Sequence, residues 1–453
     1  MTNFVKEEVK DIKGIARRFK RRDFSGNTGK VIKNSTYQLM STFVTKAGSI
    51  LFTIILARFL MGAELFGLYG LAFSTILFLG IFNDFGISSA LNFFLSKNID
   101  KNPGKAKGYF YYLTKWKIAF MMLTILTIIL ISKGLASSYQ KPIYLAILAG
   151  IIYLPAAIFS AHVIQIFTST NNFKPILVKE IILQVSRLTI IPLGIIFFLS
   201  KVKSTDAYLF WIIILLSSCH LIAGAYLYFI IKKTQPFKKQ NPIKLSKKER
   251  INLRKFILPL TVTALSGTFF VFIDQIMLGL YKITGEMLGF YYISVNLVSS
   301  ISVIIAFSGA AIFPILTRIK DSRLERGFRK SKNITLIISI LVFILSFLLA
   351  PLIIKILYGT EYVGAIIYFQ ILSLLIISFS MTSIYTAYYM SQKRTRIISI
   401  LVVLSTVLNI VLNYVFIGFG LQFSMSYAVI GACIATLISQ YLYMLTLIIF
   451  RRR

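Results

Sequence analysis

Charged side chains inside long apolar runs are the strongest candidates for chemistry in this sequence. A charge at the centre of a bilayer costs about 2.5–3.5 kcal/mol on insertion scales, so such residues usually line a cavity or meet a partner. The N-terminal half holds more basic than acidic candidates. The basic ones are Lys46, Arg58, Lys115, Lys117, Lys179 and Arg187, and the acidic ones are Asp84 and Glu180. An excess of cations at membrane depth attracts an anion, and a phosphate or diphosphate attached to a sugar chain is such an anion.

The C-terminal half offers one buried acid and several neutral polar residues. Asp274 lies in the apolar segment Phe-Ile-Asp-Gln-Ile-Met-Leu-Gly. The neutral candidates are Asn296, Gln370, Asn409 and Asn413. The last two are four residues apart, so they share one face of a helix. Amide groups both donate and accept hydrogen bonds, which suits the hydroxyls of a sugar chain.

Each candidate also has a purely structural explanation. Side chains near a helix end can extend to the membrane interface, as Arg58, Asp84 and Lys179 could do. Glu180 and Arg187 lie on one stripe of a helix and could form an ion pair. The two asparagines could hold neighbouring helices together. The two histidines of the chain, His162 and His220, are more typical of packing than of ligand binding.

The elements that carry these residues are membrane-spanning helices. Hydrophobic residues make up 57% of the chain and charged residues 14%, with a mean hydropathy of +0.78; soluble domains have roughly 45–50% and 25%. Apolar runs of about 20 residues cross the hydrocarbon core. They must be helical there, because every backbone polar group needs an internal partner. We predict about twelve spans, at 38–60, 65–92, 108–132, 142–167, 174–199, 206–231, 256–281, 286–317, 333–357, 362–390, 397–418 and 424–450.

Lysine and arginine cluster in alternate gaps between these spans. Ten basic residues occupy 1–36 and ten more occupy 232–255, with further clusters at 318–332 and 393–396. With twelve spans all of these fall on one side, which the positive-inside rule places in the cytoplasm together with both termini. Because topology explains the net charge of +35, we do not expect nucleic-acid binding.

A repeated frame divides the spans into two halves. Glu64-Leu-Phe-Gly-Leu-Tyr69 recurs as Glu286-Met-Leu-Gly-Phe-Tyr291, and each copy opens a long second span. Six spans per half give both halves the same orientation, hence a parallel repeat. We therefore predict an all-α polytopic membrane protein with two six-helix bundles. Its parts are a basic amphipathic cytoplasmic segment (1–36), a first lobe (37–231), a basic linker (232–255), a second lobe (256–450) and a basic tail (451–453).

The N-terminal segment has a membrane-binding pattern of its own. Phe4, Val5, Val9 and Ile12 recur at helical spacing among many basic residues, which indicates a helix on an anionic inner leaflet. A solvated tail is the alternative. No Cys/His metal spacing or phosphate-cradling glycine loop stands out elsewhere, so we expect neither a metal nor a cofactor.

Short motifs resemble the polysaccharide (Wzx-type) flippases of the multidrug/oligosaccharidyl-lipid/polysaccharide (MOP) exporter superfamily. Ile54-Ile-Leu-Ala-Arg-Phe-Leu60, the first repeat frame and Asn83-Asp-Phe-Gly86 are similar to the first two spans of that family. Asp274-Gln-Ile-Met-Leu-Gly279 is similar to the start of its second lobe. The resemblance covers the chain from about residue 34 to the end, and the preceding tail is similar to archaeal members. Gln275 departs from the pattern, since the family often has Arg there.

This resemblance implies a non-enzymatic flippase of the cell membrane that works by alternating access. Its cargo would be a prenyl-(pyro)phosphate-linked oligosaccharide, and glycan-assembly enzymes are possible partners. The six basic candidates would bind the phosphate, and the four neutral candidates would face the glycan. Coupling to H⁺ or Na⁺ would fall to Asp274, with Glu180 and Asp84 as further candidates.

Two other functions fit the composition less well. A multidrug and toxin extrusion antiporter usually holds cationic drugs with acidic residues, whereas the candidates here are mainly basic. A membrane polysaccharide polymerase needs a large external loop with acidic catalytic residues. No predicted external connector exceeds about nine residues.

Overall fold

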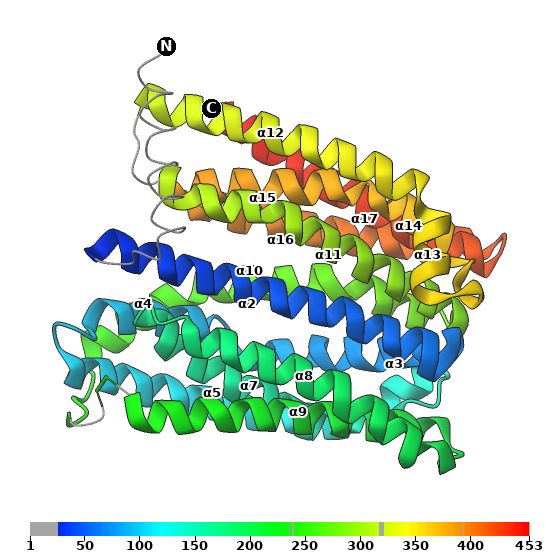
Figure 1. Ribbon diagram of the computed structural model, residues 1–453, viewed down its shortest axis with the longest axis horizontal. Helices are drawn as coiled ribbons and strands as arrows, with labels where there is room; N and C mark the ends of the chain where they lie inside the picture. Colours follow the sequence, from blue (N-terminus) through cyan, green and yellow to red (C-terminus); the bar gives the residue numbers. More distant parts are fainter. Residues whose placement is uncertain (1–25, 235, 238–239, 317–320, 393, 453) are drawn as a thin grey trace.

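The computed structural model describes residues 26–234, 236–237, 240–316, 321–392 and 394–452 (Figure 1). Most of the predicted amphipathic segment therefore lies outside the described residues. The N-terminal half contains α2 (Gly26–Ile54), α3 (Gly62–Leu79), α4 (Ile87–Asn98), α5 (Pro103–Tyr139), α6 (Tyr144–Leu148), α7 (Gly150–Ser169), α8 (Lys174–Phe197) and α9 (Thr205–Thr234). The C-terminal half contains α10 (Lys247–Leu280), α11 (Gly285–Leu316), α12 (Asp321–Leu348), α13 (Ala350–Tyr358), α14 (Ala365–Ser373), α15 (Leu375–Ser391), α16 (Thr395–Leu421) and α17 (Met425–Arg452).

The described part of the chain is built from helices, short helical turns and their connections. Eleven helical segments in it are long and apolar enough to cross a membrane. A further 32-residue helix, α11, lies where the eighth span is predicted. The prediction of an all-α polytopic membrane protein is confirmed.

The second predicted span contains a break that hydropathy does not reveal. Instead of one helix over 65–92, α3 ends at Leu79, a 3₁₀ turn follows at Gly80–Asn83, and α4 starts at Ile87. Phe85 and Gly86 both have positive φ, 37° and 72°, and a glycine adopts that conformation without steric cost. The turn at residues 84–86 therefore redirects the chain and places Asp84 at a helix junction.

The helices form two groups that meet along a central seam. Figure 1 shows α5, α7, α8 and α9 on one side and α12, α15, α16 and α17 on the other, with α2, α3, α10 and α11 between them. We call α2–α9 the N-bundle and α10–α17 the C-bundle. The basic end is the end at which α5, α8, α10, α12 and α16 begin, and the opposite end is the distal end.

Two glycines allow α3 and α11 to cross at very short range near the distal end. A Cβ atom on Gly67 would lie 1.8 Å from the carbonyl oxygen of Gly285, and one on Gly289 would lie 2.3 Å from the carbonyl oxygen of Ala63. Small residues four positions apart let the backbones of two membrane helices touch. Gly67 and Gly289 are the equivalent glycines of the repeated frame, so the crossing is made by the same motif from both bundles.

At the basic end, polar contacts join the two bundles. Lys105 at the start of α5 forms an ion pair with Glu249 at the start of α10. Deeper in the seam, the Thr261 hydroxyl of α10 donates to the Phe85 carbonyl at 2.8 Å. A Cβ on Gly86 would meet the Leu260 side chain at 2.8 Å, so the turn after α3 packs directly on α10.

Candidate functional site

Arg187 lies near the middle of α8 and faces α2 of the same bundle. Its Nη2 donates to Ser49 Oγ at 3.1 Å and to Gln184 Oε1 at 2.6 Å. The guanidinium also stacks 4.4 Å from the centre of the Phe52 ring. None of the ion pairs between described residues includes Arg187, and its Nε has no hydrogen-bond partner among them. The positive charge is therefore held by neutral groups and keeps the capacity to bind an anion.

Tyrosines from both bundles lie near this arginine. Tyr69, Tyr153 and Tyr292 lie close enough to Arg187 for their charges to influence one another. The Tyr69 and Tyr292 rings lie edge to face at 6.5 Å across the seam between α3 and α11, and Tyr153 of α7 contacts the same cluster through Phe73 at 5.2 Å. Aromatic rings beside an arginine form a surface that can contact sugar rings while the cation binds phosphate. We call Arg187 and these three tyrosines the arginine site.

Two further basic candidates lie on the helices of the arginine site. Lys46 is half buried on α2, three residues before Ser49 and so on a similar side of the helix. Lys179, two turns before Arg187 on α8, is only 5% exposed and binds Glu180 at 2.9 Å. The expected ion pair of Glu180 with Arg187 is thus replaced by one with its sequence neighbour.

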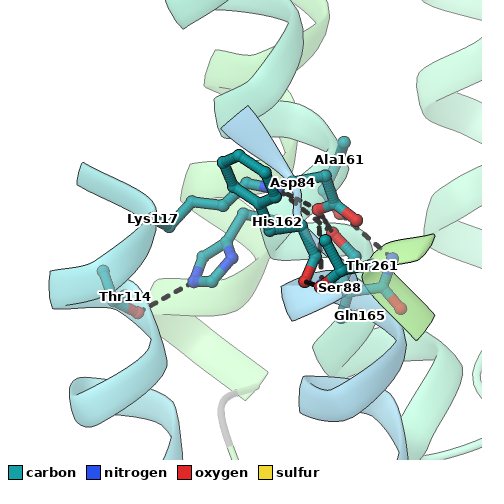
Figure 2. Close-up of polar contacts among 9 residues, drawn as sticks. Asp84, Ser88, Thr114, Lys117, Ala161, His162, Gln165 and Thr261 are labelled. Carbon is teal, nitrogen blue, oxygen red and sulfur yellow. Dashed lines mark hydrogen bonds and ion pairs between the residues drawn. The ribbon is translucent and has the colours of Figure 1, made fainter. Parts of the chain in front are cut away.

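Asp84 and Lys117 form an ion pair beside the broken second span (Figure 2). The Ser88 hydroxyl donates to the same carboxylate oxygen of Asp84 at 2.5 Å. Lys117 is 6% exposed and comes from α5, so the pair ties α5 to the turn before α4. Both residues are candidates from the sequence, but the structure makes them each other's partner.

His162 completes this polar group from α7. Its Nε2 lies 2.8 Å from the hydroxyl of Thr114 on α5, and Figure 2 shows the imidazole beside the Asp84–Lys117 pair. The group therefore joins three elements of the N-bundle at one level. Arg187 is not part of it.

Asp274 lies inside the C-bundle, 4% exposed, among neutral donors from three other helices. Tyr291 Oη of α11 donates to its Oδ2 at 2.7 Å, and Asn413 Nδ2 of α16 donates to its Oδ1 at 2.5 Å. The Thr436 hydroxyl of α17 also donates to Oδ2. A fully enclosed carboxylate with no cation beside it among the described residues can take up a proton or a small cation.

Unpartnered oxygen atoms accompany this carboxylate. Asn409 donates through Nδ2 to Ser439 Oγ at 3.2 Å, yet its Oδ1, like Asn413 Oδ1 and Gln275 Oε1, is buried without a hydrogen-bond partner among the described residues. Carboxylate, amide and hydroxyl oxygens are ligands of hard cations. We call Asp274, Tyr291, Asn409, Asn413 and Thr436 the carboxylate site.

The two sites occupy equivalent positions in the repeat. The offset that relates Tyr69 to Tyr291 also relates Phe52 to Asp274 and Arg187 to Asn409. In the N-bundle, α2 has the aromatic Phe52 and α8 carries the charge of Arg187. In the C-bundle, α10 carries the charge of Asp274 and the equivalent position on α16 is the neutral Asn409. The two bundles thus use one scaffold for opposite charges.

Four of the sequence candidates lie away from both sites or reach only their edge. Arg58 is exposed at the distal end and donates to the Ile356 carbonyl of α13. Lys115 is exposed on α5, on a different face from Lys117. Gln370 of α14 donates to the Phe347 carbonyl at 3.2 Å. Asn296 donates to the Tyr292 carbonyl at 2.7 Å and so lies one turn from the arginine site.

Sequence reasoning overlooked the hydroxyl groups of both sites. Tyr153, Tyr292 and Thr436 are ordinary residues of apolar runs and carry no signal in a single sequence. Tyr69 and Tyr291 did carry one, because both belong to the repeated frame. Applying the offset of that frame to Asp274 and Arg187 would have indicated the two equivalent positions.

Comparisons with known proteins agree with this architecture. A model of the family described as "Polysaccharide biosynthesis protein" matches residues 31–320, more than half of the chain. No curated protein sequence matches. The solved structure of the lipid II flippase MurJ in an inward closed conformation aligns with a TM-score of 0.67 at 15% identity, covering 91% of this chain and 87% of that one.

Multidrug transporters have the same fold. An inward-facing multidrug resistance MATE family transporter of the MOP superfamily aligns with a TM-score of 0.64 at 11% identity, covering 89% of this chain and 94% of that one. The eukaryotic MATE transporter AtDTX14 aligns with a TM-score of 0.62 at 16% identity, covering 96% of both chains. At such identities the likeness concerns the fold alone. Because the family model matches more than half of the chain, the chain belongs to the polysaccharide biosynthesis protein family. It is a multi-pass membrane protein with the fold of MOP superfamily transporters.

Proposed function

We propose that this protein is a flippase that moves a prenyl-(pyro)phosphate-linked oligosaccharide across the cytoplasmic membrane. The basic end would face the cytoplasm, in keeping with its lysine- and arginine-rich segments. Moving a polar headgroup through hydrocarbon without compensating contacts is costly. The protein would supply those contacts and alternate between inward and outward openings.

The arginine site is the observation that carries this proposal. Arg187 is a charge at membrane depth held only by neutral groups among the described residues, beside tyrosines from both bundles. Such a charge is costly to keep in a membrane, so it usually marks a ligand site or an ion pathway. A phosphate would bind the guanidinium, and the tyrosine rings and hydroxyls would contact the first sugar. Lys46 would add a second cation from α2.

The carboxylate site would couple transport to H⁺ or Na⁺. Asp274 is surrounded by neutral donors and by buried amide oxygens without partners, so a proton or small cation would change the charge of the C-bundle core. A change of that kind shifts the balance between two arrangements of the bundles. Asp84 is a weaker candidate for this role, because Lys117 already neutralises it.

A cationic drug is the alternative cargo, given the folds of the MATE transporters. Its recognition would need an acidic surface of the right size. Asp274 is 4% exposed and enclosed by side chains of α10, α11, α16 and α17, which suits a small ion and not an organic molecule. The charge at the seam is positive, which favours an anionic cargo.

Reconstitution into liposomes tests the proposal directly. A short fluorescent oligosaccharide on a polyprenyl diphosphate is placed in the membrane, and its arrival in the opposite leaflet is followed with a membrane-impermeant glycosidase. We expect the protein to accelerate translocation severalfold or more over empty liposomes. Extrusion of a cationic dye without movement of the glycan lipid would overturn the proposal in favour of the drug antiporter.

A further inference from the structure

The wall between α5 and α10 contains a groove that the arginine and carboxylate sites do not use. It encloses about 330 Å³ at the basic end of the seam. The N-bundle lines it with the turn after α3 and with α5, and the C-bundle lines it with the first turns of α10. The lining includes Phe85, Trp116, Phe120, Arg254, Ile257 and Thr261.

The lining is aromatic and apolar along most of its length. Phe85 and Phe120 lie 4.7 Å apart, and Trp116 and Phe120 lie 5.7 Å apart, measured between ring centres. The stretch of α10 from Arg254 to Thr261 is about 10 Å long at 1.5 Å per residue. This groove therefore suits a hydrocarbon chain that runs from the membrane interface toward the bilayer centre.

One end of the groove carries a positive charge. Arg254 lies one turn before Ile257 on α10, is exposed and belongs to none of the ion pairs between described residues. Arg254 lies two turns from the start of α10, and Arg250 lies one turn nearer the helix start; in the proposed orientation both would lie near the membrane surface. A phosphate attached to the hydrocarbon chain would meet these charges.

We propose that this groove binds the isoprenoid chain of a polyprenyl phosphate, with the phosphate at Arg254. The proposal rests on the proposed function, since it names the place at the basic end where the carrier lipid of the cargo first docks, before its phosphate reaches Arg187. Aromatic rings pack against the methyl branches that an isoprenoid has and a phospholipid acyl chain lacks. A bound chain would bridge both bundles, because Phe85 and Thr261 line the groove and are hydrogen-bonded across the seam at 2.8 Å. Docking would therefore favour the arrangement of the bundles that forms the groove.

A single tryptophan can report binding. The chain has two tryptophans: Trp116 lines the groove, whereas Trp211 lies on α9 and is not part of the lining. In a Trp211→Phe background, fluorescence of Trp116 is followed in nanodiscs as polyprenyl phosphate without any sugar is added. Phosphatidic acid, which has the same headgroup on acyl chains, is added to a matched sample. We expect a saturable change with polyprenyl phosphate at mole fractions about tenfold lower than any change with phosphatidic acid.

Matched variants separate the groove from the general lipid surface. Ile257→Phe would fill the groove, whereas Ile118→Phe adds the same ring to an exposed position of α5 that does not line it. Arg254→Gln removes the charge at the mouth, whereas Lys255→Gln removes an exposed neighbouring charge outside the lining. We expect Ile257→Phe and Arg254→Gln each to raise the half-saturating mole fraction of polyprenyl phosphate by about tenfold. The two control variants should leave it unchanged. Size-exclusion profiles confirm that each variant is folded.

The outcomes distinguish this inference from the proposed function. An equal response to phosphatidic acid, or one that Ile257→Phe leaves unchanged, would show a groove filled by ordinary membrane lipid and would overturn the inference. The assay involves no glycan and no translocation. A selective Trp116 response without glycan-lipid transport would overturn the proposed function and leave the groove assignment intact. Glycan-lipid transport without a selective Trp116 response would overturn the groove assignment and leave the proposed function intact.

Discussion

Gly67 and Gly289 hold the same position in the two copies of the repeated frame and pack against each other where α3 crosses α11. Each would place a Cβ atom against backbone of the opposite helix, at 1.8 and 2.3 Å. Backbone atoms cannot rotate away as a side chain can, so the helices would have to separate. The crossing is therefore a fixed point of the seam near the distal end, while the groove and Thr261 lie at the basic end.

Gly67→Ala should destabilise the protein by about 1–3 kcal/mol, the usual cost of overpacking. Gly134→Ala on α5 is the matched control, because a Cβ there meets nothing within 4 Å. It should be neutral or slightly stabilising, since alanine favours a helix more than glycine does. Thermal unfolding of both purified variants in the same detergent measures the difference, and equal unfolding temperatures would contradict the close crossing.

The Asp84–Lys117 pair predicts an unequal response to removal of either partner. The Lys117 side chain is 7% exposed, whereas the Asp84 side chain is 37% exposed. Asp84→Asn leaves the buried Lys117 ammonium without a counter-charge, with the Ser88 hydroxyl as a neutral acceptor at 3.2 Å. The free energy of unfolding should fall by an amount toward the lower end of the ~3–5 kcal/mol found for broken buried pairs, because screening weakens the pair at its exposed end. Lys117→Met should cost less, and the double variant should regain most of the loss. Comparable destabilisation by both single changes would argue against this burial pattern.

The carboxylate site predicts loss of ion coupling without loss of the fold. Asp274→Asn keeps the shape of the side chain but removes its charge, so ion-driven transport should stop while expression and elution profile stay the same. Thr436→Ala removes one donor to the carboxylate and should shift the half-saturating ion concentration by about tenfold, given ~1.5–3 kcal/mol for a hydrogen bond to a charge.

Thr382→Ala is the control for that experiment. Thr382 is also a buried threonine of the C-bundle, but its hydroxyl donates to the Ser378 carbonyl of its own helix at 2.8 Å. Its removal should leave the ion dependence unchanged. Full ion-coupled transport by Asp274→Asn would assign the coupling to another residue.

Thr261→Val tests the contact between the bundles at the basic end. It removes the hydrogen bond to the Phe85 carbonyl, which is worth about 1 kcal/mol. The ratio of molecules with the bundles in contact at the basic end to those with the bundles apart should therefore fall roughly fivefold. Spin-label distances between α4 and α10 should shift toward longer values. Thr268→Val removes only a bond within α10, to Ala264, and should leave those distances as they are.

The fold was predictable from the sequence because hydropathy and charge placement act locally along the chain. The break at residues 84–86 was not predicted, because hydropathy averages over Asn83, Asp84 and Gly86, which interrupt the apolar run where Phe85 and Gly86 adopt positive φ. Pairing was not predictable either. Asp274 meets donors 139 and 162 positions away, and nothing in one sequence tells which faces of distant helices meet.

Helix phase explains why only some basic candidates reach a site. Lys115 and Lys117 are two residues apart and therefore point to different faces of α5. One is exposed and the other is buried against Asp84. Composition alone treats both as intramembrane cations. Only the packing of α5 on its neighbours separates them.

Arg187 carries the central claim, and Lys115 provides its control, because Gln at either position removes one positive charge from a membrane helix. The direct measurement is the initial rate of translocation of a polyprenyl-diphosphate-linked oligosaccharide in liposomes with equal amounts of each variant. We predict that Arg187→Gln lowers the rate about 30-fold or more, on the basis of ~1.5–3 kcal/mol per charged hydrogen bond to the phosphate, and that Lys115→Gln stays within about twofold of the unmodified protein. Equal rates for the two variants would contradict the assignment of Arg187 as the phosphate-binding residue.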